Sequence, residues 1–341
     1  MATLTPPADT ACARLGRMTS REPTLREVAP GIVLIDTRMA DLEEFNAVYL
    51  LTGSQPTLVE TGPAADAPVV LAALAQLGLA AGDLAHVVVT HIHLDHSGGA
   101  GTLLPRFPRA DVWVHERGAP HLADPTRLVA STARTYGEDR MRAFFGDTAP
   151  VTEDRIRIVG DGDRIPLGDR SLDVLHTPGH ASHHLAMQDD LTGALFTGEA
   201  IGSVLPWADC FRPALPPPEV DVEAALASIE KIRARRATSL MTSHFGPVAD
   251  AGEGCDRAAA RIVEWSDTVR RHLDRDPDAP IDDVAAELGA VAAADHLADA
   301  GVPIDLTRYD AIGSIRMNAT GLARYWRKRR EAEVAPPDPS S

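Results

Sequence analysis

Residues 90–96 read Thr-His-Ile-His-Leu-Asp-His and follow the apolar stretch 84–90 without a break. The apolar stretch predicts a buried strand, and three imidazoles and one carboxylate then emerge at its carboxyl end. Imidazole nitrogen and carboxylate oxygen are the usual protein ligands of zinc, iron and manganese. The alternative is four polar groups crowded at a strand end without a ligand role, which costs on the order of kilocalories for each group buried unpaired. We therefore predict a metal site here.

The spacing within this run indicates two metal ions. In an extended turn, His91 and His93 can face one ion. Asp95 and His96 lie on the next bend, where they can face a second ion.

Short apolar runs separated by Gly, Ser and Pro predict strands along most of the chain. Between some of these runs, apolar residues recur at helical spacing and predict helices. This mixture predicts an α/β layered architecture. Strands are expected at residues 31–36, 46–51, 57–60, 84–90, 112–116, 155–159, 172–177, 184–188, 194–198 and 238–244, and helices at 67–79 and 221–235.

The chain divides into three regions by composition. Residues 1–25 are rich in Pro, Thr and Arg without periodicity, which predicts a flexible lead-in. Residues 26–250 hold the alternating strands and helices of the α/β domain. From 251 to 335 the pattern is helical, which predicts an appended C-terminal helical region.

Charge and composition limit the partners. The formal net charge of −16 disfavours nucleic acid as a partner. No apolar run approaches the roughly 18 residues of a membrane span, and the first residues do not resemble a secretory signal, so we expect no membrane partner and a cytoplasmic protein. The three cysteines are scattered and predict neither a disulfide framework nor a CxxC zinc site.

The HxHxDH run after a strand resembles the signature of the metallo-β-lactamase superfamily, and later motifs follow in the order typical of that family. Residues 177–180 read Thr-Pro-Gly-His, 195–199 Leu-Phe-Thr-Gly-Glu, and 243–246 Ser-His-Phe-Gly. The resemblance spans roughly residues 28–250 and implies a four-layer αβ/βα sandwich with the metals at one edge. It implies that His180 joins His91 and His93 on the first ion, that Glu199 bridges, and that His244 joins Asp95 and His96 on the second.

Two positions depart from the family pattern, which usually has Asp where this chain has Glu60 and Glu199. Glutamate is one methylene longer, so Glu199 bridges only from a withdrawn backbone or with a folded side chain. The alternatives are that it binds one ion and leaves the other weakly held, or that it is a surface residue in a turn. We expect the ligand role. Glu60 is expected to orient a ligand histidine by accepting its other N–H, and the resemblance suggests a similar supporting role for His184.

The segment after Glu199 is apolar and rich in proline, so Leu205, Trp207 and Phe211 are expected either to line a substrate pocket or to pack in the core. Residues 127–145 and the C-terminal helices are expected to form a lid.

The resemblance implies a hydrolase with two divalent metal ions, most often zinc, with iron or manganese as alternatives. A metal-bridging hydroxide, oriented by Asp95, would attack an ester, thioester or lactone of a small-molecule substrate. Hydroxyacylglutathione hydrolases and acyl-homoserine lactonases are the similar groups, although Thr-Ser-His at 242–244 differs from glyoxalase II, and β-lactams are not the expected substrate. A homodimer is also suggested by the family.

Two other activities stay open. A persulfide dioxygenase-like enzyme would hold one iron through His91, His180 and Glu199. A phosphodiesterase would use the two-metal site on a phosphorus centre. A protein that only binds its ligand is disfavoured, because a full ligand set is hard to explain without chemistry.

Overall fold

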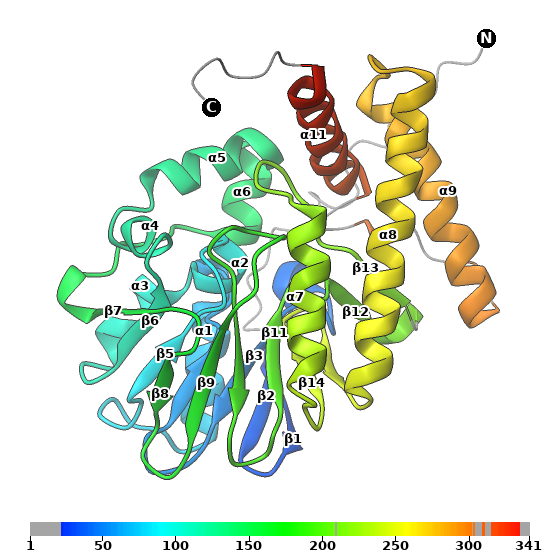
Figure 1. Ribbon diagram of the computed structural model, residues 1–341. Helices are drawn as coiled ribbons and strands as arrows, with labels where there is room; N and C mark the ends of the chain where they lie inside the picture. Colours follow the sequence, from blue (N-terminus) through cyan, green and yellow to red (C-terminus); the bar gives the residue numbers. More distant parts are fainter. Residues whose placement is uncertain (1–21, 209, 302, 304–308, 311–314, 335–341) are drawn as a thin grey trace, which may run out of the picture.

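Two β-sheets lie face to face, and helices cover the outer side of each (Figure 1). The computed structural model describes residues 22–208, 210–301, 303, 309–310 and 315–334. The first sheet contains, in spatial order, β1 (Thr24–Ala29), β2 (Ile32–Asp36), β3 (Ala47–Leu51), β4 (Thr57–Val59), β5 (His86–Val88), β6 (Asp111–His115) and β7 (Ile156–Val159). The second contains β15 (Gly246–Val248), β14 (Leu240–Thr242), β11 (Leu195–Gly198), β10 (Leu185–Asp189), β9 (Ser171–His176) and β8 (Arg164–Pro166).

The remaining elements lie around these sheets. A separate hairpin pairs β12 (Ser203–Leu205) with β13 (Cys210–Arg212). The helices are α1 (Ala67–Gln76), α2 (Leu94–Ser97), α3 (Ala100–Leu103), α4 (Ala119–Ala123), α5 (Thr126–Tyr136), α6 (Glu138–Phe145), α7 (Val222–Ala234), α8 (Ala251–Arg275), α9 (Ile281–Ala300) and α11 (Ile315–Val334).

Strand β3 explains why the central strands appear as unbroken apolar runs. Side chains alternate across a strand, so Val48 and Leu50 pack under the helices of the first sheet. Tyr49 and Leu51 point the other way, into the layer between the sheets. A strand buried on both faces needs apolar residues at every position.

Three apolar layers hold the four structural layers together. One lies between the two sheets, where the rings of Tyr49 and Phe196 meet edge to face at 5.3 Å. A second lies between the first sheet and helices α1 and α3, and a third between the second sheet and helices α7 and α8. The expected four-layer sandwich is therefore confirmed.

The C-terminal helices extend the third layer. Trp265 of α8 and Leu322 of α11 belong to the same buried cluster as Leu240 of β14. A side chain of α11 also bonds to the C-terminal end of α8. Arg330 donates to the carbonyl of Leu273 at 2.7 Å, where helix carbonyls lack partners. The helical region thus shares one core with the α/β domain.

The structure differs from the sequence expectations at several places. Strand β1 begins at Thr24, so the expected lead-in at 1–25 overlaps the first strand, and residues 1–21 lie outside the described residues. Strands β1, β8, β12, β13 and β15 were not expected, since they are short or lie at the edges. Across the described helices, none combines the length and the hydropathy that crossing a bilayer requires.

A buried ion pair ties the two sheets together. The guanidinium of Arg170 donates to both carboxylate oxygens of Asp189, at 2.8 and 2.6 Å, and both side chains are almost fully buried. Its third nitrogen donates to the carbonyls of Gly31 and Thr52 beside the first sheet, at 3.2 and 3.3 Å. Burial alone would raise the pKa of Asp189, but the bonds from Arg170 and Thr192 hold it below the ordinary value.

We predict that Arg170→Ala lowers the free energy of unfolding by about 3–5 kcal/mol, because it leaves the Asp189 carboxylate buried without its partner. The matched control is Arg164→Ala, which removes a half-exposed bridge to Asp190 and should change stability by about 1 kcal/mol or less. Urea unfolding of the two variants measures the difference. Equal losses would show that the buried pair has no special weight.

Candidate metal centre

The polar run after β5 lies at the edge of the sandwich where several parallel strands end. Strands β4, β5 and β6 run parallel in the first sheet, and β11 and β14 run parallel in the second. The carboxyl ends of parallel neighbours meet at one edge. The segment 91–96 follows β5, Glu199 follows β11, and His244 follows β14.

The seven residues expected as metal ligands come together here in two groups of donor atoms. In each group the donor atoms lie within 4.8 Å of one another. The first group is His91, His93, His180 and Glu199, and the second is Asp95, His96 and His244.

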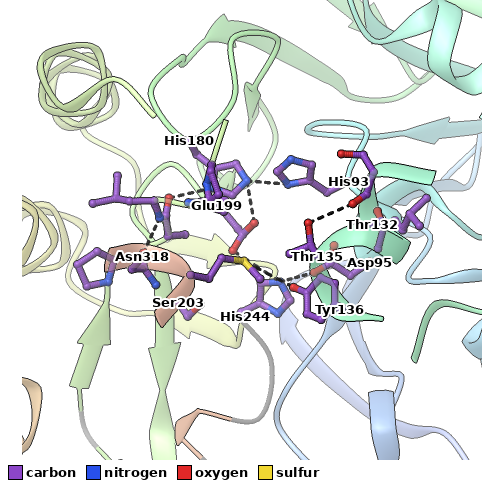
Figure 2. Close-up of a pocket in the computed structure, with 18 of the residues that line it drawn as sticks. His93, Asp95, Thr132, Thr135, Tyr136, His180, Glu199, Ser203, His244 and Asn318 are labelled. Carbon is purple, nitrogen blue, oxygen red and sulfur yellow. Dashed lines mark hydrogen bonds and ion pairs between the residues drawn. The ribbon is translucent and has the colours of Figure 1, made fainter. Parts of the chain in front are cut away.

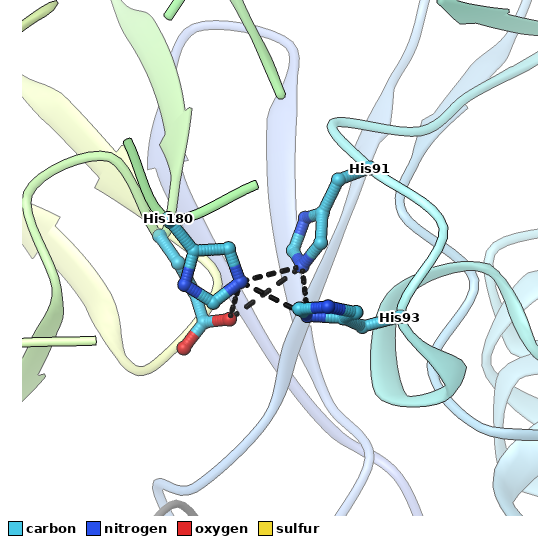
Figure 3. Close-up of side chains that lie close together, drawn as sticks. His91, His93 and His180 are labelled. Atoms are coloured by element: carbon cyan, nitrogen blue, oxygen red, sulfur yellow. Dashed lines mark hydrogen bonds and ion pairs between the residues drawn. The ribbon is translucent and has the colours of Figure 1, made fainter. Parts of the chain in front are cut away.

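The first group brings three imidazole nitrogens to one point (Figure 3). His180 Nε2 lies 3.2 Å from His91 Nε2 and 2.9 Å from His93 Nδ1. His91 Nε2 and His93 Nδ1 are 3.0 Å apart. Glu199 Oε2 completes the group at 3.0 Å from His180 Nε2.

The second group shares Glu199 with the first. His96 Nε2 lies 3.3 Å from His244 Nε2 and 3.6 Å from Asp95 Oδ2. Glu199 Oε2 lies 3.4 Å from His96 Nε2 and 3.5 Å from His91 Nε2. One carboxylate oxygen therefore stands between the two groups.

The hydrogen bonds of the ring nitrogens that point away from the donor groups show which nitrogens of His180 and His244 have a lone pair for a metal ion. His180 Nδ1 bonds the carbonyl of Ala214 at 2.9 Å, and His244 Nδ1 bonds the carbonyl of Phe45 at 2.7 Å. A carbonyl only accepts, so each Nδ1 carries the proton and, in the neutral ring, each Nε2 presents a lone pair.

Converging lone pairs repel unless a cation lies between them. Nitrogens bound tetrahedrally about 2.0–2.1 Å from one zinc ion lie roughly 3.3 Å apart. The spacings of 2.9–3.2 Å in the first group are close to this value. The donor set therefore fits divalent metal ions.

The electrostatics of the groups also favour bound cations. Burial lowers the pKa of His91 well below its ordinary value and that of His93 to about 4. Both low pKa values favour the neutral ring, which has a lone pair for a metal ion. Burial alone would raise the pKa of Glu199, but the surrounding imidazoles, His180 foremost, hold it well below its ordinary value. Burial alone would lower the pKa of His96, and the carboxylates of Asp95 and Glu60 instead raise it well above.

Glu60, which was expected to contact a ligand histidine, lies in hydrogen-bond contact with the surroundings of both groups. It is buried, and its Oε1 lies 3.2 Å from His96 Nδ1. The same oxygen accepts from Thr90 Oγ1 at 2.6 Å and from Ser243 Oγ at 3.0 Å. Thr90 Oγ1 in turn lies 2.9 Å from His91 Nδ1. Glu60 thus contacts His96 directly and His91 through one hydroxyl.

His184 supports Glu199 through the backbone. Its Nε2 accepts from the backbone N–H of Glu199 at 3.1 Å, and its Nδ1 lies 2.8 Å from Thr177 Oγ1. Gly198, at φ 53°, makes this approach possible, since a Cβ there would lie 2.6 Å from His184 Nε2 and from Thr90 Oγ1.

A cavity of about 160 Å³ opens onto both groups (Figure 2). One wall is α5, which contributes Thr132, Thr135 and Tyr136. The opposite wall is the proline-rich segment 213–218, and α11 adds Met317 and Asn318. The expected lid from residues 127–145 and the C-terminal helices therefore coincides with part of the lining.

The three expected pocket residues lie elsewhere. Leu205, Trp207 and Phe211 do not line this cavity and instead pack in the core beneath α8, where Leu205 and Phe211 are buried. For Phe211, the alternation of the β12–β13 hairpin explains the difference, because Ser203 and Arg212 line the cavity while Phe211 points to the other side. Leu205 shares the face of Ser203 but lies two residues further along β12, and Trp207 follows the end of that strand.

Sequence reasoning missed several residues of this site. Thr90 and Ser243 directly precede predicted ligands, and that adjacency was the available signal. His183, whose Nε2 accepts from the backbone N–H of Ile92 at 3.2 Å, gave no signal beyond its neighbour His184.

Comparison with known proteins agrees with this geometry. The family model described as the metallo-beta-lactamase superfamily matches residues 43–244. An acyl-coenzyme A thioesterase of Gallus gallus is 31% identical over 206 residues, which cover 53% of this chain and 68% of that protein. A hydroxyacylglutathione hydrolase of Hahella chejuensis is 34% identical over 119 residues, 34% of each chain.

A solved structure supports the fold. A metallo-beta-lactamase family protein of Thermus thermophilus superposes with a TM-score of 0.60 at 20% identity, covering 92% of this chain and 98% of that one. At this identity the likeness concerns the fold alone. The family model, however, matches more than half of the chain, and this protein therefore belongs to the metallo-beta-lactamase superfamily.

Proposed function

We propose that this protein is a hydrolase with two divalent metal ions that cleaves an ester, thioester or lactone bond. The family and its thioesterase and hydroxyacylglutathione hydrolase relatives support the coarser statement that it is a metal-dependent hydrolase. The observation that carries the two-metal proposal is the position of Glu199 Oε2, within 3.5 Å of His91, His180 and His96.

In this proposal each residue has a defined role. His91, His93 and His180 hold one ion, Asp95, His96 and His244 hold the other, and Glu199 is shared. When bound, the ions would lower the pKa of a water molecule and polarise the carbonyl group of the substrate.

The protein's own residues supply orientation and proton transfer. Asp95 lines the cavity, and in this proposal its carboxylate accepts the proton of the attacking water and returns it to the leaving group. Glu60 and the carbonyls of Phe45 and Ala214 fix the ligand rings, which keeps the donor atoms in place before substrate binds.

The cavity volume supports a small reacting portion. About 160 Å³ is below the roughly 300–1,000 Å³ of pockets that enclose a whole drug-sized ligand. The carbonyl and a short acyl chain fit inside, whereas a large leaving group such as a coenzyme would lie outside. A one-iron oxygenase would use His91, His180 and Glu199 and leave the second group without a role.

We predict two metal ions per chain in the wild-type protein, measured by elemental analysis after loading with zinc, manganese or ferrous iron. His93→Gln should weaken one site and His244→Gln the other, while Glu199→Gln should weaken both, because it is the shared ligand. His121→Gln, outside both groups, is the matched control and should retain two. A single iron with oxygen uptake would contradict the two-metal proposal.

We predict that Glu60→Gln lowers metal affinity about 10- to 100-fold, since the amide cannot accept every bond that the carboxylate accepts. Competition with a chromogenic chelator measures the affinity. Glu116→Gln, an exposed residue after β6, is the control. Unchanged affinity in Glu60→Gln would mean that this network does not set ligand orientation.

We predict that the metal-loaded protein hydrolyses short acyl thioesters, esters or lactones, and that a chelator abolishes the activity until metal is restored. Assays on acyl N-acetylcysteamine thioesters, p-nitrophenyl esters and lactones test the bond type. Faster cleavage of bis-p-nitrophenyl phosphate than of every acyl substrate would favour a phosphodiesterase instead.

A further inference from the structure

A buried arginine that the proposed chemistry does not use lines the cavity. Arg212 ends strand β13 and is only 4% exposed, yet it lines the same cavity as Glu199 and His244. Among the described residues that line this cavity, no other arginine and no lysine is present.

Backbone pairing places Arg212 close to the metal centre. Ser203 pairs with Arg212 in the β12–β13 hairpin. On its other side, β12 bonds the chain after β14, where the N–H of Phe245 donates to the carbonyl of Val204 at 2.8 Å. Adjacent strands lie about 4.8 Å apart, so the backbone of Arg212 is roughly 10 Å from that of Phe245, which directly follows His244.

The partners of this guanidinium in the described part of the chain are uncharged. It donates to the carbonyl of Tyr309 and to Ser203 Oγ, the latter at 3.4 Å, and lies over the Tyr309 ring at 5.4 Å. Burial raises the pKa of the Asp310 carboxyl group, and the electrostatic interaction with the nearby Arg212 lowers it by less than burial raises it. Asp310 Oδ1 instead accepts from the N–H of Ile315 at 2.6 Å.

A buried cation whose hydrogen-bond partners, among the described residues, are uncharged is costly, and an anion that enters the cavity would offset this cost. Guanidinium groups bind carboxylates through paired, charge-assisted hydrogen bonds. Because Arg212 is buried within a small cavity, the anion has to belong to the portion of the substrate that fits inside.

We propose that Arg212 binds a carboxylate at the far end of a short acyl chain, so that the preferred substrates are thioesters or esters of dicarboxylic acids. This proposal rests on the proposed hydrolase function. Water adds to the carbonyl carbon, the carbon–sulfur or carbon–oxygen bond breaks, and one proton of the water passes to the leaving thiolate or alkoxide. The other proton is released as the new carboxyl group ionises, so the products are a dicarboxylate, a thiol or alcohol, and a proton. The carboxylate on Arg212 takes no part in the bond change and acts in specificity.

The test compares two thioesters of N-acetylcysteamine that differ in one terminal group. Succinyl carries a carboxylate where pentanoyl carries an ethyl group of similar size. In the wild type we expect a higher kcat/KM for succinyl. In Arg212→Met the ratio of the two kcat/KM values should fall about 10- to 100-fold, the usual effect of losing a charge-assisted hydrogen bond.

The matched control is Arg257→Met. Arg257 stacks on Phe211, on the side of β13 away from the cavity, at 4.9 Å. Its substitution should leave the ratio of the two kcat/KM values unchanged. Arg212→Lys keeps the positive charge but lacks the paired N–H donors of the guanidinium group, so its ratio of kcat/KM values should be intermediate. This variant also provides a second test if Arg212→Met does not fold.

A binding measurement separates this proposal from the hydrolase proposal. Monomethyl succinate should raise the melting temperature of the wild type more than neutral dimethyl succinate does, and Arg212→Lys should reduce the difference. If none of the thioesters, esters and lactones is hydrolysed but this difference remains, the hydrolase proposal fails and the anion site stands. If the ratio and the melting temperatures do not depend on Arg212, the residue only anchors Tyr309 and Ser203 and the proposal is overturned.

Discussion

The hydrogen bonds of the buried Glu60 carboxylate link the two groups of donor atoms to one another. Glu60 follows β4 in a left-handed conformation, at φ 68°, and reaches side chains from three separate segments. It connects Thr90, which follows β5, with His96 on α2 and Ser243 after β14. Because these segments come from both sheets, one side chain sets the relative position of the two groups of donor atoms. The ends of the sheets are thereby held in register with each other.

Much of this arrangement was predictable because it follows from strand polarity. A polar run after a buried strand has to emerge at the strand's carboxyl end, and parallel neighbours end at the same edge. His91, His93, Asp95 and His96 could be placed from their own sequence in this way. His180, Glu199 and His244 needed the order of motifs as well, since nothing local to a histidine between two strands identifies its partners.

The walls of the cavity were harder to predict for a physical reason. Leu205, Trp207 and Phe211 are as apolar as pocket residues. For Phe211, whether the side chain faces the cavity or the core depends on the register of a hairpin of three-residue strands. A shift of one residue exchanges the two faces. The segment that forms α5 was expected to belong to a lid, but the individual lining residues Thr132 and Thr135 gave no signal of their own, because hydroxyl side chains are common on any surface helix.

Helix α11 has a consequence for how the site is completed during synthesis. All seven donor residues precede it in the chain, and the last of them, His244, is translated some seventy residues before Ile315. Asn318 accepts from the N–H of Leu215 at 2.7 Å and so steadies the proline-rich wall from the far end of the sequence. A nascent chain can therefore assemble its donor atoms while the substrate side stays open, and the cavity gains its final wall only when the last helix docks.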